Sequence, residues 1–212
     1  MNNRLAIILS VLFHPLILTT YLFALLCLWF PDLIGLSAFE WPALISLLTL
    51  LFLNTFVAPA VVTYYFMKMG VITNLYVDDV SERRLPYLVT AIIYGLATYL
   101  FGWQLQPVGQ MAPQISFILA SVTVSLVIIT CVSFFWKISA HATGIGGVVA
   151  MLAGLLMRSE DYDLLNPLLV TILLAGLLLS ARLQLNAHNP AQILVGFLCG
   201  VLVSSITVYF YF

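Results

Sequence analysis

Long apolar stretches separated by short polar segments dominate the pattern of hydrophobic and polar positions along the chain. A run of about 20 apolar residues is long enough for a helix to cross a hydrocarbon core of roughly 30 Å. The pattern predicts seven such helices, joined by connections that are polar or rich in glycine and proline. The predicted helices cover residues 5–30, 41–67, 86–103, 115–136, 141–157, 164–181 and 193–212.

The first predicted helix contains a His14-Pro15 pair that interrupts its pattern. Proline lacks a backbone N–H and prefers the first turn of a helix, so the pair predicts either a kink or a short interfacial segment before a shorter helix. Charging a histidine deep in a bilayer is costly, which favours this structural role for His14 over a role in a site. The run is too long for a signal peptide and lacks a small-residue cleavage site, so we expect a membrane span.

The composition of the chain is that of an integral membrane protein. Of its 212 residues, 63% are hydrophobic and only 7% are charged, and the mean hydropathy is +1.14. We therefore expect a single all-α domain over residues 1–212, built as a polytopic bundle of about six to seven transmembrane helices in a lipid bilayer. A formal net charge of -1 provides no basic field to attract nucleic acid, so no nucleic-acid partner is expected.

Small residues recur at intervals of four in the last three predicted helices. Such rows allow helix backbones to approach closely in lipid. We expect these three helices to form a compact bundle that holds the polar residues at their ends. The small residues are Gly146, Ala150, Gly154, Gly176, Ser180, Gly196, Gly200 and Ser204.

Most of the basic residues are predicted to lie at one face of the membrane. Each crossing carries the chain to the other side, and two crossings separate Arg84 from His141 and His141 from Arg182. Counted in this way, six of the seven Lys and Arg residues, including Arg4, share one face, and only Arg158 lies opposite. The residues that converge there are Lys68, Arg83, Arg84, Lys137, His141, Arg182 and His188.

This cluster of cations and imidazoles suits an anion, above all a phosphate. Arginine offers a planar fork that matches two phosphate oxygens, and lysine adds a point charge. The helices predicted to begin beside His141 and His188 add the partial positive charge of their amino termini. Positive flanks that only set membrane topology are the alternative, and this is our interpretation of Arg4. Topology gives no reason for histidines at matching helix ends, so we assign Arg182 and His188 to a site.

Three short stretches resemble motifs of the type-2 phosphatidic acid phosphatase and vanadium haloperoxidase superfamily. One stretch is similar to the SR-x5-H-x3-D motif, the most specific of the three: five residues separate Arg182 from His188, and three separate His188 from Gln192. Ser-Ala-His at 139–141 resembles the PSGH motif, and Arg-Arg-Leu-Pro at 83–86 resembles the end of the K-x6-RP motif. The resemblance covers a core of about residues 68–200.

The resemblance implies a membrane lipid-phosphate phosphohydrolase that works without a metal or other cofactor. His188 would be the nucleophile that forms a phosphohistidine, and His141 the general acid that protonates the leaving oxygen. Arg182, with Arg83 or Arg84, would grip the phosphoryl oxygens. Phosphoryl transfer in general asks for such a nucleophile, a positioned acid and fixed cations. The implied substrate is a phosphomonoester or diphosphate of an isoprenoid or glycerolipid.

The sequence departs from these motifs at several positions. Gln192 stands where the superfamily has the aspartate that orients the nucleophilic histidine. Its carbonyl can accept a hydrogen bond from the ring but brings no negative charge, so turnover could be slow. Val77 stands where the first motif would place its lysine. Lys137 either compensates from another loop or is only an interfacial lysine that ends the fourth predicted helix. Ala140 and Ala181 replace a glycine and a serine.

Other functions are compatible with some of the same residues. Asp78, Asp79 and Glu82 could form a carboxylate site for Mg²⁺, but ion pairs with the neighbouring arginines explain them more simply, so we expect no metal site. A protein that binds or transports a lipid phosphate without turnover would use the same pocket and would fit the missing aspartate. A membrane cytochrome with His141 and His188 as axial haem ligands belongs to another class, and the surrounding arginines do not require a haem.

Charge gives only weak evidence for the orientation in the membrane. Arg4 favours a cytoplasmic position for the face that carries the motifs, because positive flanks tend to stay inside. The resemblance implies the opposite orientation, with the site on the periplasmic or other extracytoplasmic side of the cell (inner) membrane. We expect the orientation that the resemblance implies.

Overall fold

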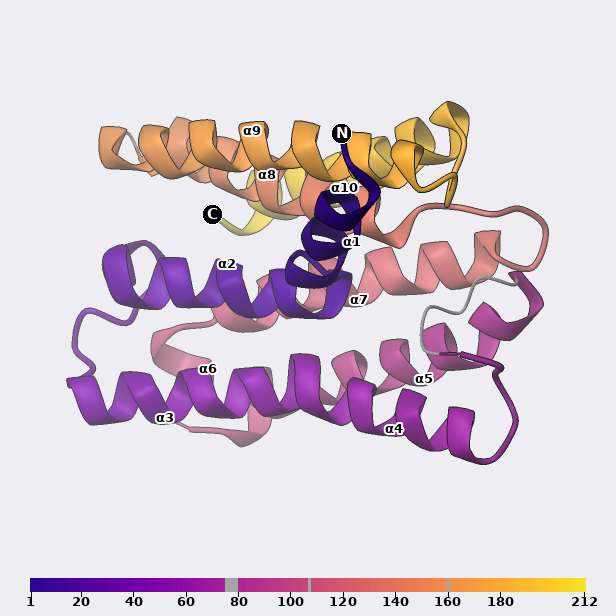
Figure 1. Ribbon diagram of the computed structural model, residues 1–212. Helices are drawn as coiled ribbons and strands as arrows, with labels where there is room; N and C mark the ends of the chain where they lie inside the picture. Colours follow the sequence, from indigo (N-terminus) through magenta and orange to yellow (C-terminus); the bar gives the residue numbers. More distant parts are fainter. Residues whose placement is uncertain (75–79, 107, 160) are drawn as a thin grey trace.

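The computed structural model is a bundle of long helices, and it describes residues 1–74, 80–106, 108–159 and 161–212. Every regular element within these ranges is helical, which confirms the predicted all-α class. Figure 1 shows the long helices lying side by side, with α1 crossing them at a steep angle. In chain order the α-helices are α1 (Asn3–Leu12), α2 (Pro15–Trp29), α3 (Trp41–Phe52), α4 (Ala58–Lys68), α5 (Val80–Tyr99), α6 (Val108–Met111), α7 (Gln114–Val132), α8 (Ala140–Ser159), α9 (Leu165–Gln184) and α10 (Pro190–Tyr211).

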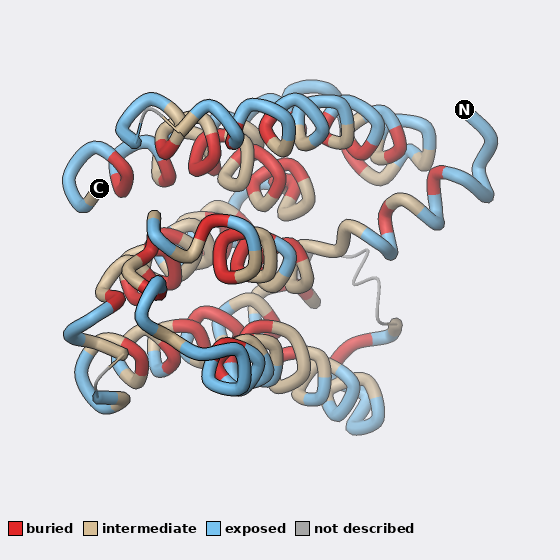
Figure 2. The backbone as a smooth tube through the Cα atoms, turned by 90° about the vertical axis from the view of Figure 1, so that its left-hand side faces the viewer, coloured by how far each residue is buried: buried red, intermediate tan, exposed pale blue. Residues whose placement is uncertain are grey.

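The described helices are suited to a membrane in their length and in their surfaces. Six are long and apolar enough to cross a bilayer, and the bent pair α1–α2 is a seventh candidate. Figure 2 shows the buried residues on the sides of the helices that face one another. The outer sides are also apolar: Leu96, Leu173 and Leu202 have exposed fractions of 64%, 65% and 61%. Such surfaces are stable against lipid chains rather than water, so the chain is a multi-pass membrane protein, as predicted.

The break predicted at His14-Pro15 is present and is sharp. α1 and α2 meet at an angle of 59°. Pro15 opens α2, and the Leu16 N–H donates to His14 Nδ1 at 3.4 Å, which makes His14 the N-cap of that helix. The Gln184 side-chain amide donates to Asn3 Oδ1 at 3.0 Å. This bond ties the start of α1 to the end of α9.

The second span runs without interruption from Trp41 to Lys68, but it contains a π-helical turn, Leu53–Val57, between α3 and α4. Pro59 follows this turn and cannot donate to the carbonyl four residues earlier, that of Thr55. The buried Tyr94 hydroxyl, from α5, donates to this carbonyl at 2.8 Å. A side chain from another helix thus supplies a donor at a depth where water cannot.

Helices α8 and α10 approach each other closely at their small residues. A Cβ on Gly200 would collide with the Thr143 carbonyl oxygen, and a Cβ on Gly196 would lie 2.7 Å from the Ser139 carbonyl oxygen. By contrast, no described atom of another segment lies within 4 Å of the place where a Cβ on Gly176 of α9 would stand. The predicted close packing is therefore correct for α8 and α10, and Gly176 takes no part in it.

Substituting alanine at these glycines tests this packing. We expect Gly200→Ala to lower the free energy of unfolding by about 2 kcal/mol or more, because the new methyl group meets a backbone oxygen that cannot rotate away. The matched control Gly176→Ala is expected to change it by no more than about 1 kcal/mol, in the stabilising direction, because alanine favours the helix. Thermal unfolding in detergent measures both variants. Equal stabilities would contradict the packing described here.

Candidate functional site

The residues predicted to share one membrane face lie at the end of the bundle where α4, α7 and α9 end and α8 and α10 begin, at the right of Figure 1. His188 lies between α9 and α10 and is only 7% exposed. Just before it, Asn186 adopts a left-handed conformation with φ 49°, which asparagine tolerates. The Ala187 N–H then donates to the Arg182 carbonyl at 3.1 Å. This reversal folds the chain back over the end of α9 and brings His188 towards Arg182.

The His188 ring is held by the first turn of α10. Asn189 and Gln192 form a capping box: the Gln192 N–H donates to Asn189 Oδ1 at 2.9 Å, and the Asn189 N–H donates to Gln192 Oε1 at 3.2 Å. The same Oε1 lies 3.2 Å from His188 Nδ1. Because Oε1 is an acceptor, Nδ1 carries the ring proton, and the lone pair of a neutral ring is on Nε2.

Three cations from three segments act on the His188 ring. Burial is the largest influence and lowers its pKa, and the positive charges of Arg83, Arg182 and Lys137 lower it further, to about 3. The hydrogen bond to Gln192 acts weakly in the opposite direction. Arg83 is itself buried, with an exposed fraction of 4%. At neutral pH the site therefore combines an uncharged imidazole with a positive surrounding.

The lowered pKa predicts the charge state of His188 across the acidic range. We expect the ring to stay neutral, with its proton on Nδ1, from pH 7 down to about pH 3, because burial and the nearby cations oppose a further charge. In the unfolded chain the pKa of His188 has its ordinary value of 6.5, so the unfolded state binds a proton there that the folded state does not. This residue therefore makes the folded state less stable as the pH falls below 6.5. Nitrogen-15 NMR of histidine-labelled protein measures the state directly. A ring that becomes an imidazolium near pH 6 would contradict the prediction.

The segment that carries His141 is fastened to the segment that carries His188. Ser139 caps α8, since its Oγ accepts the Ala142 N–H at 3.3 Å, and His141 lies in the first turn of that helix. The Ser139 N–H in turn donates to the Gln192 carbonyl oxygen at 3.4 Å. The close approach of Gly196 to the Ser139 carbonyl, described above, belongs to the same contact. The packing of α8 on α10 thus fixes the two histidine-bearing segments relative to each other.

The His141 side chain contacts the α1–α2 segment. Its Nε2 lies 3.0 Å from the Ser10 carbonyl oxygen, which can only accept, so Nε2 carries the proton. The His14 ring stands edge-on to the His141 ring, with centroids 5.6 Å apart and planes at 81°. The charges of Arg182 and His188 are also close enough to act on His141. Three side chains of the site, those of His14, Arg182 and His188, therefore lie near this ring.

The two neighbouring arginines of α5 have different surroundings. Arg83 acts on His188, as described above. The Arg84 guanidinium instead donates from Nη2 to the Phe134 carbonyl oxygen at 3.2 Å and lies 5.0 Å from the centroid of the Phe134 ring. Arg84 thereby attaches α5 to the connection between α7 and α8. Of the two arginines proposed from the sequence, the structure places Arg83 at the histidine.

A cavity of about 840 Å³ opens beside these residues. Lys137, His141 and Arg182 are among the residues that line it. His188 borders it through its neighbour Ala187 and is not itself part of the lining. The remaining lining residues come mainly from α1 and from the α3–α4 span and are mostly apolar; they include Ile7, Val11, His14, Leu16, Phe56, Ala60 and Thr63. The cavity wall therefore combines cationic residues with apolar side chains.

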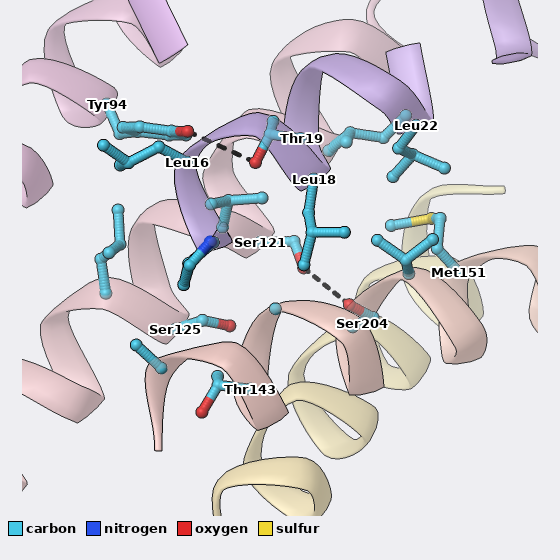
Figure 3. A pocket seen from close by; sticks show the side chains of 18 of the residues that line it. Leu16, Leu18, Thr19, Leu22, Tyr94, Ser121, Ser125, Thr143, Met151 and Ser204 are labelled. Carbon is cyan, nitrogen blue, oxygen red and sulfur yellow. Dashed lines mark hydrogen bonds between the residues drawn. The ribbon is translucent and has the colours of Figure 1, made fainter. Parts of the chain in front are cut away.

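A second, narrower cavity of about 70 Å³ lies deeper in the bundle, between α2, α7, α8 and α10 (Figure 3). That volume holds only a few water molecules. Its wall is mainly apolar but includes hydroxyl groups, among them Ser121 and Ser204, whose oxygens are 3.3 Å apart, and Thr19, which the Tyr94 hydroxyl contacts at 3.3 Å. These pairs satisfy polar groups across helices where lipid offers no partner. None of the predicted site residues lines this cavity.

The carboxylates considered for a metal site are only partly covered by the structure. Asp78 and Asp79 lie outside the described residues, as does Val77. Glu82 accepts hydrogen bonds from the Thr73 N–H at 3.0 Å and the Thr73 hydroxyl at 3.1 Å. Within the described ranges, no three His, Cys, Asp or Glu side chains are grouped closely enough to hold a metal ion. Glu82 thus holds the segment after α4 to the start of α5.

Two groups at the site were not expected from the sequence, the Ser10 carbonyl and the His14 ring. Both belong to the α1–α2 junction, outside the residues 68–200 that the family resemblance covers. The preference for a structural role at His14 is correct in that it caps α2, but the ring also lines the cavity. The position of Arg4 on the same face was the one signal that this segment begins near the site.

No protein-family model, no curated protein and no solved structure matches this chain. The class is therefore defined by the fold and the site alone. The chain is a multi-pass helical membrane protein with a cationic, histidine-containing cavity at one end of its bundle.

Proposed function

We propose that this protein is a membrane lipid-phosphate phosphatase that transfers the phosphoryl group first to His188 and then to water. The observation that carries the proposal is the state of the His188 ring, a neutral imidazole with Nδ1 bound to Gln192 and with Arg83, Lys137 and Arg182 around it. A nitrogen nucleophile must be neutral, and fixed cations stabilise the charge that spreads over phosphoryl oxygens. Both requirements are met at one residue.

The proposed reaction of a phosphomonoester has two steps at phosphorus. In the first, the lone pair of His188 Nε2 forms the N–P bond while the bond from phosphorus to the lipid oxygen breaks, and its electrons leave with that oxygen. His141, in its imidazolium form for this step, gives the oxygen its Nε2 proton and is left as a neutral ring, so the lipid departs as an alcohol. In the second, a water oxygen attacks phosphorus, a water proton passes to His141, and the N–P electrons return to Nε2. Inorganic phosphate leaves, and both histidines regain their starting state.

The position of the His141 proton adds a condition to the first step. The Nε2–H is directed at the Ser10 carbonyl oxygen, 3.0 Å away. The leaving oxygen of the lipid must therefore replace this carbonyl as the acceptor. Ser10 lines the same cavity as His141, so a substrate that enters the cavity reaches the two partners of this bond together.

The shape of the cavity wall supports a lipid as the carrier of the phosphate. Lys137 and Arg182 supply charge to this wall. Ile7 and Val11 of α1 also line the cavity and have exposed fractions of 46% and 56%. A phosphate held by the cations would leave its hydrocarbon chain against these side chains. An isoprenoid or glycerolipid phosphate or diphosphate is the substrate class that we propose.

We place the site on the periplasmic or other extracytoplasmic side of the cell (inner) membrane. A single cysteine at Met69, which is 75% exposed at the end of α4, tests this orientation in a chain from which Cys27, Cys131 and Cys199 have been removed. A membrane-impermeant maleimide added to intact cells is expected to label Met69→Cys. Labelling only after the cells are opened would place the site in the cytoplasm.

A second function, binding or transport of a lipid phosphate without turnover, uses the same cavity. Gln192 favours it, because a neutral amide cannot stabilise an imidazolium at His188 as a carboxylate would. The bond from His141 to Ser10 favours it too, since the acid is already engaged. This alternative predicts saturable binding of lipid phosphates with no release of inorganic phosphate.

A panel of lipid phosphates and diphosphates tests the proposal with purified protein. We expect inorganic phosphate to be released from at least one isoprenoid or glycerolipid substrate, with EDTA present throughout. Binding without release of phosphate would favour the binding or transport function. If the protein showed no binding and no release, both functions would be overturned. The visible absorbance of the same preparation tests the haem alternative.

A further inference from the structure

His14 is the residue of the cavity that neither the family motifs nor the phosphoryl-transfer scheme uses. It lies in the connection between α1 and α2 and lines the cavity together with Lys137, His141 and Arg182. Its ring stands edge-on to that of His141, with centroids 5.6 Å apart. A third histidine therefore belongs to the same chamber as the proposed acid and two of the cations.

The hydrogen bond of His14 determines what its ring can offer to a ligand. The Leu16 N–H donates to His14 Nδ1 at 3.4 Å, so Nδ1 acts as an acceptor and the proton of the neutral ring is on Nε2. Among the described residues, the bond with the Leu16 N–H is the one hydrogen bond of this ring. One nitrogen of the ring thus caps α2, and the other leaves a donor in a cavity that also contains cations.

We propose that His14 is a third histidine of the phosphate site and that it donates its Nε2–H to an oxygen of the bound phosphoryl group. This inference rests on the proposed function. A neutral donor adds a hydrogen bond to an anion without adding charge beside Lys137 and Arg182. It also makes the α1–α2 junction a part of the binding site.

Asparagine separates this role from the capping role. Asparagine is among the best N-caps, so His14→Asn retains an acceptor for the Leu16 N–H but places no ring donor in the cavity. We expect the variant to unfold at nearly the wild-type temperature and to bind a short-chain lipid phosphate about tenfold more weakly, which is the scale of one hydrogen bond to a charged group. The increase is expected in KM, with kcat changed much less. Ile8→Ala, at a residue of α1 that is 53% exposed and does not line the cavity, is expected to match wild type.

Direct NMR detection in the wild-type protein gives a second test that does not depend on folding of the variant. Titration with the same lipid phosphate is expected to shift the His14 Nε2–H signal. Wild-type affinity in a folded His14→Asn variant, or a His14 signal that does not move on saturation, overturns the inference and leaves the proposed function intact. A wild-type protein that neither binds nor hydrolyses the lipid phosphate overturns both.

Discussion

His188→Ala is expected to reduce the turnover of a lipid phosphate by at least about 10⁴-fold, because it removes the only nitrogen that the proposed reaction uses to bond phosphorus. The rest of the site should survive, since Arg83, Lys137 and Arg182 come from other segments. We therefore expect affinity for the lipid phosphate to change by less than about threefold, so the loss falls in kcat. Initial rates of phosphate release and equilibrium binding measure the two quantities separately.

Trapping the phosphohistidine intermediate, which is labile in acid, provides a positive test of the same assignment. Rapid quenching of wild-type protein with a substrate labelled in its phosphoryl group is expected to trap phosphohistidine at His188, and the His188→Ala variant should trap none. Leu183→Ala, at a 41% exposed residue near the end of α9 that does not line the cavity, controls for damage to this end of the bundle. Turnover above a tenth of wild type in a folded His188→Ala variant would refute the assignment of the nucleophile.

Substituting the neighbouring arginines of α5 should give unequal effects. Arg83→Gln is expected to lower kcat/KM by about 10²- to 10³-fold, the usual cost of removing one group that stabilises transition-state charge. Arg84→Gln is expected to lower it by less than about fivefold, because Arg84 is engaged with Phe134 rather than with the histidine. Glutamine keeps much of the length and polarity of each side chain while removing the charge, so the pair is matched in chemistry and sequence position.

Steady-state kinetics on the best substrate of the panel measures both variants. Thermal unfolding should show the complementary pattern, with a small loss of stability in Arg84→Gln from its hydrogen bond to the α7–α8 connection, about 1 kcal/mol. Equal losses of kcat/KM, or a larger loss in Arg84→Gln, would show that the position of Arg83 beside His188 has no role in turnover.

Much of the helical architecture was predictable because a bilayer imposes a length and an apolar surface on each crossing. The break at His14-Pro15 was predictable for a local reason, since proline has no N–H to continue a helix. The end of α7, in contrast, was not predictable from the sequence. The apolar run continues to Trp136, but the helix ends at Val132, and the exposed Phe135 and its neighbours form the connection to α8. Aromatic residues at a membrane interface look like a continued span in a hydrophobicity pattern.

The site was predictable to the extent that it depends on counting crossings and on helical spacing. Counting placed Lys137, His141 and Arg182 at one face, and all three line the cavity. Spacing placed His188 and Gln192 four residues apart, which allows the bond between Nδ1 and Oε1. The carboxamide of Gln192 also closes a capping box with Asn189, a second role that the motif does not imply.

The sequence by itself determined that this protein is a multi-pass helical membrane protein and that most of its basic residues gather at one end of the bundle, because these features follow from local composition and from the thickness of a bilayer. The tertiary structure alone shows that Arg83 and Arg84 have different surroundings, which their adjacent positions in the chain cannot reveal. The tertiary structure alone also shows Ser10 and His14 beside His141. Their position depends on the bend between α1 and α2 and on the hydrogen bond from α1 to α9, which joins residues far apart in the chain. Side-chain direction and contacts between distant segments are what a linear pattern leaves open.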